Sequence, residues 1–548
     1  MDSQRSLLVI ALLAVSYLLW IEWTQDYGPQ QPETTQQQAQ NINKGESLSE
    51  DVPMSESMSP DALPVVKQET SRQIINVETD TLVLKIDTKG GDVISAQLKQ
   101  YLVELGSDDL VTLLNDNHSR LYIAQSGLIG RDGPDASSDG RPVYHTTQQN
   151  YTLTEQQLVV PLTYTSTNGV TYTKEFVFER NSNSIKVVYR ISNASDSTIS
   201  LHQYAQLKQT MNAPQEGSMF MPTYSGAAYS TENENYEKYS FEDIADDNLT
   251  ESTKAGWVAM MQHYFVTAWI PPQEEINKLY SRALNGGMAS IGYTGELKTV
   301  APNDTLEIQS VLYIGPKIQD NLAKLANNLD LTVDYGFLWW LAQPLFMLLS
   351  IIQEFINNWG FSIIIITIIV KGAMFWLTKA QYESMAKMRA LQPKMQALKD
   401  RFGEDRQKMS QAVMELYRKE KVNPMGGCFP LLLQMPIFMA LYWVLLESVE
   451  LRHADFALWI TDLSTPDPYF ILPALTGLTM YLLQKLQPMT IQDPMQQKIM
   501  QWMPVAMSVF FFMFPAGLVL YWLISNIITL VQAKIIYSAM EKKGLKAK

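Results

Sequence analysis

The chain has 548 residues, a formal net charge of −14 and a mean hydropathy of −0.09, which averages a polar part and an apolar part. Residues 24–336 carry 40 acidic and 21 basic side chains, so this polar part lacks the basic surface that nucleic-acid binding requires. The single cysteine, Cys428, excludes an intrachain disulfide, and the five histidines lack the spacing of metal ligands.

The N-terminal segment is an apolar run followed by a polar stretch. Residues 7–21 are apolar except for Ser16, and Trp20 and Trp23 suit the water interface of a membrane span. A cleaved signal peptide would end at a small-x-small site, which the residues after Trp23 do not offer. We therefore predict a retained anchor over residues 1–27. Residues 28–73 are rich in Gln, Ser, Pro and Glu, which predicts a flexible linker.

From about residue 74 to residue 314 the pattern is typical of β-structure. Four runs alternate or cluster β-forming residues: Leu82–Ile86, Leu158–Thr165, Thr171–Phe178 and Ile185–Ile191. Asn168-Gly169, between the second and third runs, is a strong hairpin signal. Many short strands over this length predict a large antiparallel sandwich. We interpret its aromatic residues and carboxylates as core and solvated surface rather than as a sugar site, because they form no catalytic motif.

Four apolar stretches follow, at residues 359–377, 428–446, 469–483 and 500–531. As one helix the last stretch would be about 48 Å long, beyond the roughly 30 Å of a hydrocarbon core. Phe514-Pro515-Ala516-Gly517 offers a break at its middle, so we predict a hairpin of two spans there. With the N-terminal anchor, the chain then has six spans.

A further apolar segment, Phe337–Ile352, complicates this topology. If it spanned the membrane, the loop 379–427 with its 11 Lys and Arg residues would face outward, against the positive-inside rule. We predict instead an interfacial helix that lies flat and is broken near Pro344. Both chain ends and the loops 379–427 and 485–498 then face the cytoplasm, and the acidic segments 24–358 and 448–468 face outward.

The predicted fold class is an α-helical polytopic membrane protein with six transmembrane helices and a large all-β outer domain. In chain order the predicted parts are the anchor (residues 1–27), the linker (28–73), the β-sandwich domain with a C-terminal helical connector (74–335), the interfacial helix (336–356), the second span (357–378), a basic cytoplasmic hairpin (379–427), the third span (428–447), an outer loop (448–468), the fourth span (469–484), an inner loop (485–498), the fifth span (499–514), the sixth span (515–537) and a basic tail (538–548).

The basic loop 379–427 has its own apolar pattern. Apolar residues recur at helical spacing on either side of Gly403, namely Met385, Met388, Leu391, Met395 and Leu398 before it and Met409, Val413 and Leu416 after it. This pattern predicts an amphipathic helical hairpin. Its simplest interpretation is a solvated connector, but a methionine-rich surface beside positive charge also suits varied hydrophobic peptides.

Lys371 lies inside the apolar run of the second span. A charge near a helix centre costs about 2.5 to 3.5 kcal/mol on insertion scales, so such a residue is a functional hypothesis unless its side chain reaches the interface. Gln434, Gln484, Asn526 and Gln532 also lie mostly toward the cytoplasmic halves of their spans. We infer a hydrated groove open to the cytoplasm, although each amide alone is equally explained as packing between helices.

Other classes of membrane protein are less well supported. No span interior contains Asp or Glu, which argues against an ion-coupled transporter. No G-x-x-x-x-G-K loop is present, which argues against an internal ATPase. A small-solute transporter and a membrane-anchored periplasmic binding protein or enzyme stay as alternatives.

Several motifs carry a family resemblance. After MDSQRSLLVIALL come NWGFSIIIIT (358–367), KAQYESMAKMRALQPKMQALK (379–399), EKVNPMGGCFPLLLQMPIFMALY (420–442), DPMQQKIMQWMP (493–504) and FPAGLVLYW (514–522). Over essentially its whole length the chain resembles the YidC/Oxa/Alb family of membrane protein insertases, in the Gram-negative form with a large periplasmic domain. The resemblance implies one anchor, a periplasmic β-supersandwich, an interfacial helix and a five-helix insertase core in the inner membrane.

The resemblance also implies an activity and partners. The expected activity is insertion of nascent membrane proteins, alone or with the Sec translocon, without enzymatic chemistry, cofactor or metal. The expected partners are nascent membrane proteins, the Sec translocon, the translating ribosome and the phospholipid bilayer, with no direct nucleic-acid readout. The expected substrate-binding residues are Lys371, Thr367, Gln434, Phe438, Thr476, Phe510 and Trp522.

Three of these positions differ from the family pattern. Lys371 stands where the family has its groove arginine, so the charge is kept but the bidentate fork is lost. Thr476 stands where a methionine is expected, and Trp522 where a tyrosine is expected. Thr367, one turn before the lysine, and the aromatic residues Phe438 and Phe510 match the family.

Overall fold

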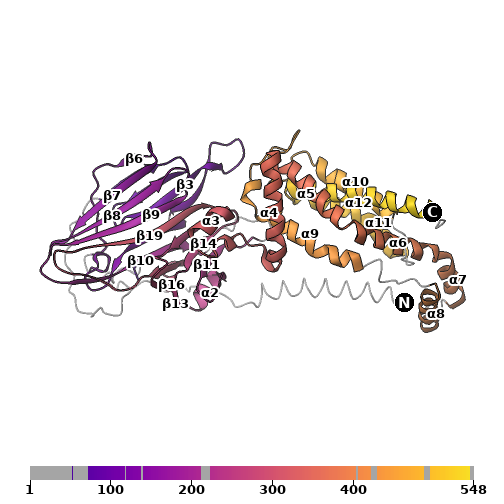
Figure 1. Cartoon of the computed structure of the whole chain (residues 1–548), viewed down its shortest axis with the longest axis horizontal. Coiled ribbons are helices and arrows are strands. Elements are labelled where there is room, and N and C mark those ends of the chain that lie inside the picture. Colours follow the sequence, from indigo (N-terminus) through magenta and orange to yellow (C-terminus); the bar gives the residue numbers. More distant parts are fainter. Residues whose placement is uncertain are drawn as a thin grey trace, which may run out of the picture.

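The computed structural model places a β domain at one end of the molecule and a helical bundle at the other (Figure 1). It describes residues 52–53, 72–117, 119–137, 140–211, 223–402, 405–420, 429–486 and 494–542. The predicted anchor over residues 1–27 and most of the predicted linker over residues 28–73 lie outside the described residues.

The β domain consists of two sheets. Within the described residues the first sheet contains β1 (Ile74–Glu78), β2 (Leu82–Asp87), β3 (Asp92–Leu102), β4 (Leu110–Asn117), β5 (Arg120–Ile129), β6 (Asn150–Thr152), β10 (Ile199–Thr210), β13 (Thr250–Lys254), β16 (Ile276–Leu284), β17 (Met288–Thr294) and β18 (Lys298–Val300). The second contains β7 (Gln157–Thr165), β8 (Val170–Glu179), β9 (Ser184–Asn193), β11 (Gly226–Ser230), β12 (Glu237–Tyr239), β14 (Trp257–Met261), β15 (Phe265–Ile270) and β19 (Thr305–Pro316). The pairings are antiparallel except for β1 beside β6, which confirms the predicted β-sandwich.

The predicted hairpin at Asn168-Gly169 is confirmed. β7 and β8 pair in register from Gln157 opposite Glu179 to Thr165 opposite Thr171. Gly169 adopts a φ of 89°, a conformation that glycine reaches without steric cost. The other predicted strand runs, Leu82–Ile86 and Ile185–Ile191, coincide with β2 and β9.

The core of the β domain is apolar with one buried charged cluster. Trp257, Trp269 and Phe176 are among its largest fully buried side chains. Lys174 is also fully buried, and its ammonium group donates to the carbonyls of Gly90, Gly91 and Ser126 at 3.0, 2.7 and 3.1 Å. A buried charge needs such partners, so this lysine belongs to the folded core.

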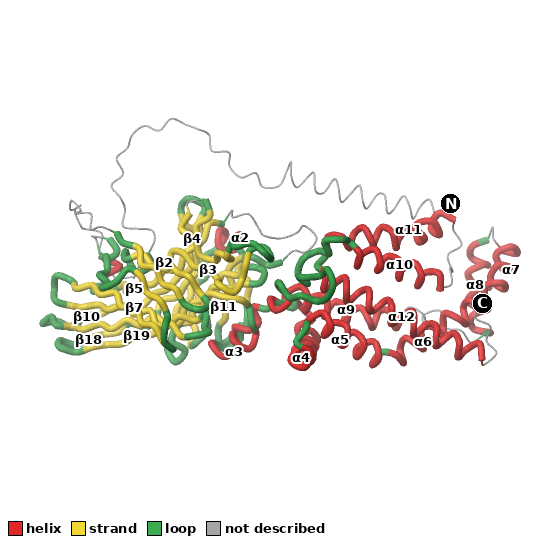
Figure 2. The backbone as a smooth tube through the Cα atoms, turned by 90° about the horizontal axis from the view of Figure 1, so that it is seen from above, coloured by secondary structure: helices red, strands yellow, loops and turns green. Residues whose placement is uncertain are grey.

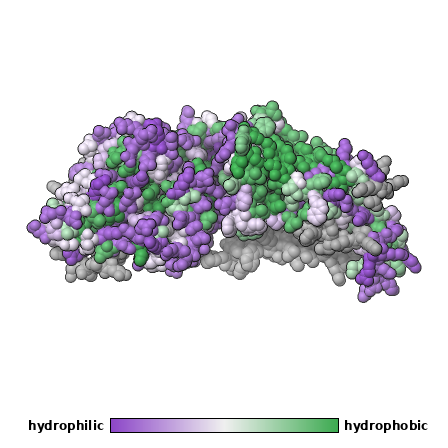
Figure 3. All heavy atoms as spheres, viewed as in Figure 1, coloured by the Kyte–Doolittle hydropathy of each residue, from purple (hydrophilic) through white to green (hydrophobic). Residues whose placement is uncertain are grey.

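The helical part begins after the last strand. Its helices are α3 (Gln319–Leu325), α4 (Trp339–Ile356), α5 (Trp359–Ala373), α6 (Phe375–Ala390), α7 (Gln392–Phe402), α8 (Arg406–Lys419), α9 (Phe429–Glu447), α10 (Ile471–Leu486), α11 (Pro494–Phe510) and α12 (Ala516–Lys542), and a short helix, α2 (Phe241–Asp246), lies in the β domain. α12 packs against α5, α6, α9 and α10, and α11 packs against α10. The surface in Figure 3 is largely apolar over this bundle and largely hydrophilic over the β domain.

Only part of the predicted span count follows from helix length. Among the described residues, two helices are long and apolar enough to cross a membrane, 336–356 and 516–540. The pair 359–373 and 375–388 passes the same test together, with a bend of 60° between its halves. Shorter apolar helices cover residues 433–447 and 501–513. The count of six spans therefore stays a prediction.

The predicted break at Phe514–Gly517 is confirmed, but the predicted break near Pro344 is wrong. α11 ends at Phe510, a 3₁₀ turn covers Phe511–Met513, and α12 starts at Ala516. α4, in contrast, runs without interruption from Trp339 to Ile356 with Pro344 inside it. Proline removes one backbone hydrogen bond, and the packing of the buried residues Ala342, Leu349 and Ile352 offsets that loss.

Two further helix boundaries differ from the predictions. The sequence predicts a second span that extends to residue 378, but α5 ends at Ala373 and α6 continues in another direction. The helical spacing of apolar residues from Met385 to Leu398 predicts one helix in the first arm of the basic hairpin, but this arm divides at Leu391 into α6 and α7. Pro393 explains this second break, because proline is accommodated in the first turn of a helix and disfavoured in its interior.

α4 is oriented differently from the rest of the bundle. Figure 1 shows it crossing the ends of α5 and α9 that face the β domain, while α5, α9, α10 and α12 extend away from it, and Figure 2 shows α4 nearly end-on. α4 packs against both α5 and α9. Its exposed side includes Trp339, Trp340 and Phe355.

Candidate functional site

Lys371 lies in the last turn of α5, where the helix bends toward α6. α5 starts at the N-cap residue Asn358, whose side chain accepts a hydrogen bond from the amide of Phe361. A long isoleucine run then leads to the lysine. Lys371 is partly buried, and no hydrogen bond or ion pair to its ammonium group occurs within the part of the chain that the structure describes. Its positive charge at the carboxyl end of the helix is favoured by the helix dipole.

Two glutamines contact the region around this bend. The side-chain amide of Gln532, on α12, donates to the carbonyl of Lys371 at 3.0 Å. The side-chain amide of Gln434, on α9, donates to the hydroxyl of Thr378 at 3.5 Å. Sequence reasoning assigned both glutamines to a hydrated groove, and the structure places them against the two sides of the α5–α6 bend. Thr378 had no sequence signal beyond being a threonine beside an apolar run.

The two threonines of the predicted site are fully buried. Thr367 lies one turn before Lys371 and its hydroxyl donates to the carbonyl of Ile363 at 2.6 Å. Thr476, on α10, donates in the same way to the carbonyl of Leu472 at 2.8 Å. Both hydroxyls are thus satisfied by their own helices, and both side chains face helix neighbours in this conformation.

Phe438 and Trp522 of the predicted site lie together. Their ring centroids are 4.7 Å apart, and Trp522 also lies 4.5 Å from Phe511. Phe438 stacks on Tyr521 at 5.9 Å. These four residues, Phe438, Phe511, Tyr521 and Trp522, form an aromatic cluster between α9, α12 and the turn after α11. The contacts of Trp522 are edge to face and that of Phe438 with Tyr521 is stacked, and both are preferred arrangements of aromatic rings.

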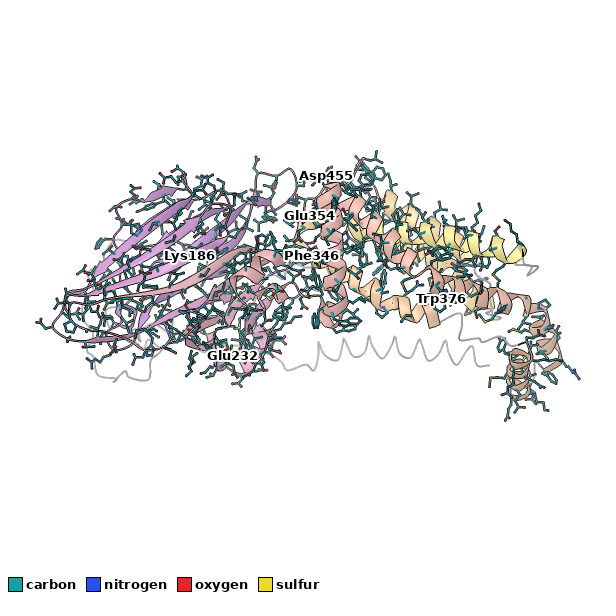
Figure 4. All side chains as sticks on the ribbon, in the orientation of Figure 1. Lys186, Glu232, Phe346, Glu354, Trp376 and Asp455 are labelled. Atoms are coloured by element: carbon teal, nitrogen blue, oxygen red, sulfur yellow. The ribbon has the colours of Figure 1, made fainter. Side chains whose placement is uncertain are left out.

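Phe510 lies next to this cluster rather than within it. Its ring is 4.8 Å from that of Phe514, which in turn lies 6.1 Å from Phe511. It is 37% exposed, so it presents an apolar surface outward. On α6, just after the bend, Trp376 is 75% exposed (Figure 4). Exposed aromatic residues of this kind suit contact with lipid or with an apolar segment.

The basic hairpin is formed by α7 and α8. The ammonium group of Lys394 pairs with the carboxylate of Glu420 at 2.6 Å, and the hydroxyl of Tyr417 donates to the sulfur of Met395 at 3.5 Å. Met414, on α8, is 67% exposed. The predicted hairpin is therefore confirmed in these two helices, and it presents an apolar side chain beside basic ones.

A junction between the β domain and the helices was missed by sequence reasoning. Lys317 and Glu447 form a buried ion pair at 3.9 Å. The Nε2 atom of His263 lies 3.0 Å from the carbonyl of Leu446, and burial lowers the pKa of this histidine to about 4. The guanidinium of Arg452 donates to the carbonyl of Leu102 at 2.7 Å. These partners are far apart in sequence, so no local pattern could have paired them.

Comparisons with known proteins agree along the whole chain. The family model described as the YidC periplasmic domain matches residues 74–348, and the one described as 60Kd inner membrane protein matches residues 351–543. The chain is 60% identical over 548 residues to the membrane protein insertase YidC of Pseudoalteromonas atlantica and 53% identical to that of Shewanella piezotolerans, covering 100% of each protein.

A solved structure of an active YidC insertase with its first transmembrane domain resolved also matches. The TM-score is 0.37 and the identity 18%, over 85% of this chain and 92% of that one. The family models and the full-length relatives show the family, and these relatives are insertases and not enzymes. They set aside the transporter and the anchored enzyme as alternatives. The chain therefore belongs to the YidC family of membrane protein insertases, which act at the inner membrane.

Proposed function

We propose that this insertase receives nascent membrane proteins in a hydrophilic groove that opens to the cytoplasm and contains Lys371. The observation that carries the proposal is the Lys371 ammonium group, which has no protein partner within the described residues although it follows a long isoleucine run. A cation in such a place needs water or a counter-charge. When a substrate enters, its acidic side chains supply the counter-charge and its polar groups take the place of water.

The groove belongs to a core of five spans, α5, α9, α10, α11 and α12, with residues 1–27 as the sixth. The long helix α12, the bent pair α5 and α6, and the shorter apolar helices in α9 and α11 support four of these spans. α10 is assigned as the fifth because it packs against both α11 and α12. A span shorter than the bilayer is accommodated by local thinning of the bilayer. α4 passes the length test for a span, but its crossing direction and its exposed Trp339 and Trp340 favour the membrane interface.

The orientation follows from charge. With α7 and α8 and both chain ends in the cytoplasm, the basic segments face inward. The acidic β domain and the loop after α9 then face the periplasm. The division of charge in the sequence supports this arrangement, since residues 24–336 carry 40 acidic and only 21 basic side chains.

Substrate binding uses two adjacent surfaces. The polar tail of the substrate enters beside Lys371 and Gln434, and any acidic side chain in it pairs with the lysine. The apolar segment lies along the aromatic cluster and Phe510 and passes from there into lipid. Thr367 and Thr476 back these surfaces from within the bundle, and they become accessible only if the helices separate.

The driving force needs no nucleotide. Burial of an apolar span in lipid favours transfer by about 25 cal/mol per Å². An acidic residue that moves outward gains about 2.3 kcal/mol per charge for each 100 mV of membrane potential. Lys371 lowers the barrier between these end states by pairing with the acidic group on its way.

The partners follow from where the basic and apolar surfaces lie. The basic hairpin of α7 and α8 is the surface for a translating ribosome, through attraction to its phosphates and without base readout. The exposed apolar side chains of the bundle suit the bilayer or the Sec translocon. The protein inserts nascent membrane proteins alone or with that translocon.

Photo-crosslinking to stalled nascent chains tests the substrate path. A benzoyl-phenylalanine at Phe438 should capture the apolar segment of a stalled substrate, because the aromatic cluster lines the path. The same probe at Trp376, an exposed aromatic position on α6 that is not part of the aromatic cluster, is the matched control and should capture much less. Equal capture at both positions would contradict a defined path through the bundle.

A further inference from the structure

The bend between α5 and α6 has an identifiable cause. Sharp helix kinks arise at proline, at glycine or serine pairs, at bulges, or where a side chain enters the backbone ladder. Residues 370–378 contain no proline. A Cβ atom added at Gly372 would have no atom within 4 Å, so no close neighbour requires a glycine at this position. A side chain does enter the ladder, because the Gln532 amide donates to the carbonyl of Lys371 at 3.0 Å.

The partners of the last carbonyls of α5 show why this contact matters. A helix end leaves its final carbonyls without partners inside the helix. The backbone amide of Met374 donates to the carbonyls of Val370 and Gly372, and the side-chain amide of Gln532 donates to the carbonyl of Lys371. Gln532 is itself buried, so its amide replaces a backbone donor in a place of limited access to water.

α12 continues past Gln532 as the surface on which α6 lies. Ala533, Ile536 and Met540 of α12 form one apolar cluster with Tyr382 and Ala386 of α6. The rings of Tyr382 and Tyr537 meet edge to face at 5.4 Å. α12 therefore holds the end of α5 through Gln532 and holds α6 through the next two turns.

On the other side of the bend, α9 holds the start of α6. The hydroxyl of Thr378 donates to the carbonyl of Met374 at 3.3 Å, and Gln434 donates to that hydroxyl. These bonds are longer than the bond from Gln532. The bend is thus fixed from two helices, most closely from α12.

We propose that Gln532 is a positioning residue that stabilises the α5–α6 bend and thereby sets where Lys371 meets substrate and in which direction α6 leads to the basic hairpin. This inference rests on the proposed role of Lys371 in substrate binding. It predicts that an apolar residue of similar size at position 532 straightens the bend. The contact between Lys371 and the substrate is then weaker, although Lys371 itself is unchanged.

The bend can be measured directly by distances between spin labels in the full-length protein. Cys428 is first replaced by serine, and labels are attached at Phe361 on α5 and Lys387 on α6, which are both exposed. From the helical rise, the two backbone positions are about 34 Å apart at the observed bend and about 39 Å apart on a straight helix. Gln532→Met should broaden the distribution and shift it toward the longer value.

A matched control separates this effect from general damage to α12. Thr529 lies one turn earlier, and its hydroxyl donates to the carbonyl of Ser525 in the same helix. Thr529→Val should therefore leave the distance unchanged. An unchanged distance in Gln532→Met, or an equal shift in both variants, would overturn the proposal.

The functional arm compares substrates with acidic and neutral tails in a pulse-labelled insertion assay at matched insertase levels. Gln532→Met should reduce insertion of the acidic-tail substrate by about two- to tenfold, the factor expected for one lost hydrogen bond, and affect the neutral one less. If Lys371→Gln impairs the acidic substrate but Gln532→Met does not, the positioning role is wrong and the proposed function stands. If Lys371→Gln also has no effect, the proposed function fails first.

Discussion

The two halves of the molecule differ in how they surround a lysine side chain, which is fully buried in the β domain and partly buried in the helical bundle. In the β domain, Lys174 is fully buried and donates to three backbone carbonyls, beside Arg141, Asp92 and Asp135. In the helical bundle, Lys371 has no such partner within the described residues. A lysine whose donors are all satisfied stabilises a fold, whereas a lysine left unsatisfied in an apolar setting is available to a ligand.

The largest expected difference between the two halves is in activity. Replacing residues 392–419, which hold α7 and α8, by a short Gly-Ser link should abolish insertion, because the hairpin is the proposed surface for the translating ribosome that delivers the substrate. α6 would still pack on α12 through Tyr382 and Ala386, so the membrane core should stay folded. Removing residues 74–314 should leave most activity. Insertion assays with both deletions measure how much activity each part contributes. Normal insertion without the hairpin would show that the hairpin is only a connector.

The second difference concerns stability. Lys174→Met should destabilise the β domain by about 3 to 5 kcal/mol, since it leaves two buried carboxylates with one fewer cation nearby and removes three hydrogen bonds to backbone carbonyls. Lys371→Met should not destabilise the bundle, because it removes an unpaired charge. Pulse proteolysis of each full-length variant in detergent, over a series of urea concentrations, measures both effects. A loss of similar size in both variants would contradict the distinction between the two lysines.

The third and smallest effect is the dependence of β-domain stability on pH. Burial lowers the pKa of Lys174 to about 7, whereas the unfolded chain keeps this proton up to the ordinary lysine value near 10.5. Between these pH values the unfolded state binds more protons, so stability should rise with pH, by at most about 1.4 kcal/mol per unit. The same proteolysis measurement at pH 7 to 9 should show this rise in the wild type and not in Lys174→Met. If the stability of the wild type and of Lys174→Met rose equally with pH, the rise would come from groups other than Lys174.

Much of the fold could be predicted because its signals are local. Alternating residues predicted β2, β7, β8 and β9, and the Asn168-Gly169 and Phe514–Gly517 segments predicted a hairpin turn and a helix break. The α5–α6 bend could not be predicted, because its cause is Gln532, 161 residues further along the chain. The continuous helix through Pro344 likewise depends on tertiary packing.

The candidate site was predictable to a smaller extent. The cost of a charge in an apolar run was enough to select Lys371. The aromatic cluster and the two threonines came from family resemblance, because in a wholly apolar helix the sequence does not reveal which face is buried. The burial of Thr367 and Thr476 and the bracing contacts of Gln434 and Gln532 therefore became visible only in the structure.

The measurement that tests the central claim most directly exchanges charge on both partners. Lys371→Arg, Lys371→Gln and Lys371→Glu are compared in a pulse-labelled insertion assay, with substrates whose tails are acidic or neutral. The arginine variant should insert normally. The glutamate variant should fail most with acidic tails, because like charges repel strongly in a poorly screened groove, and neutral tails should partly rescue it. If all three variants insert comparably and the tail charge makes no difference, the lysine does not pair with substrate, and the proposed mechanism is wrong.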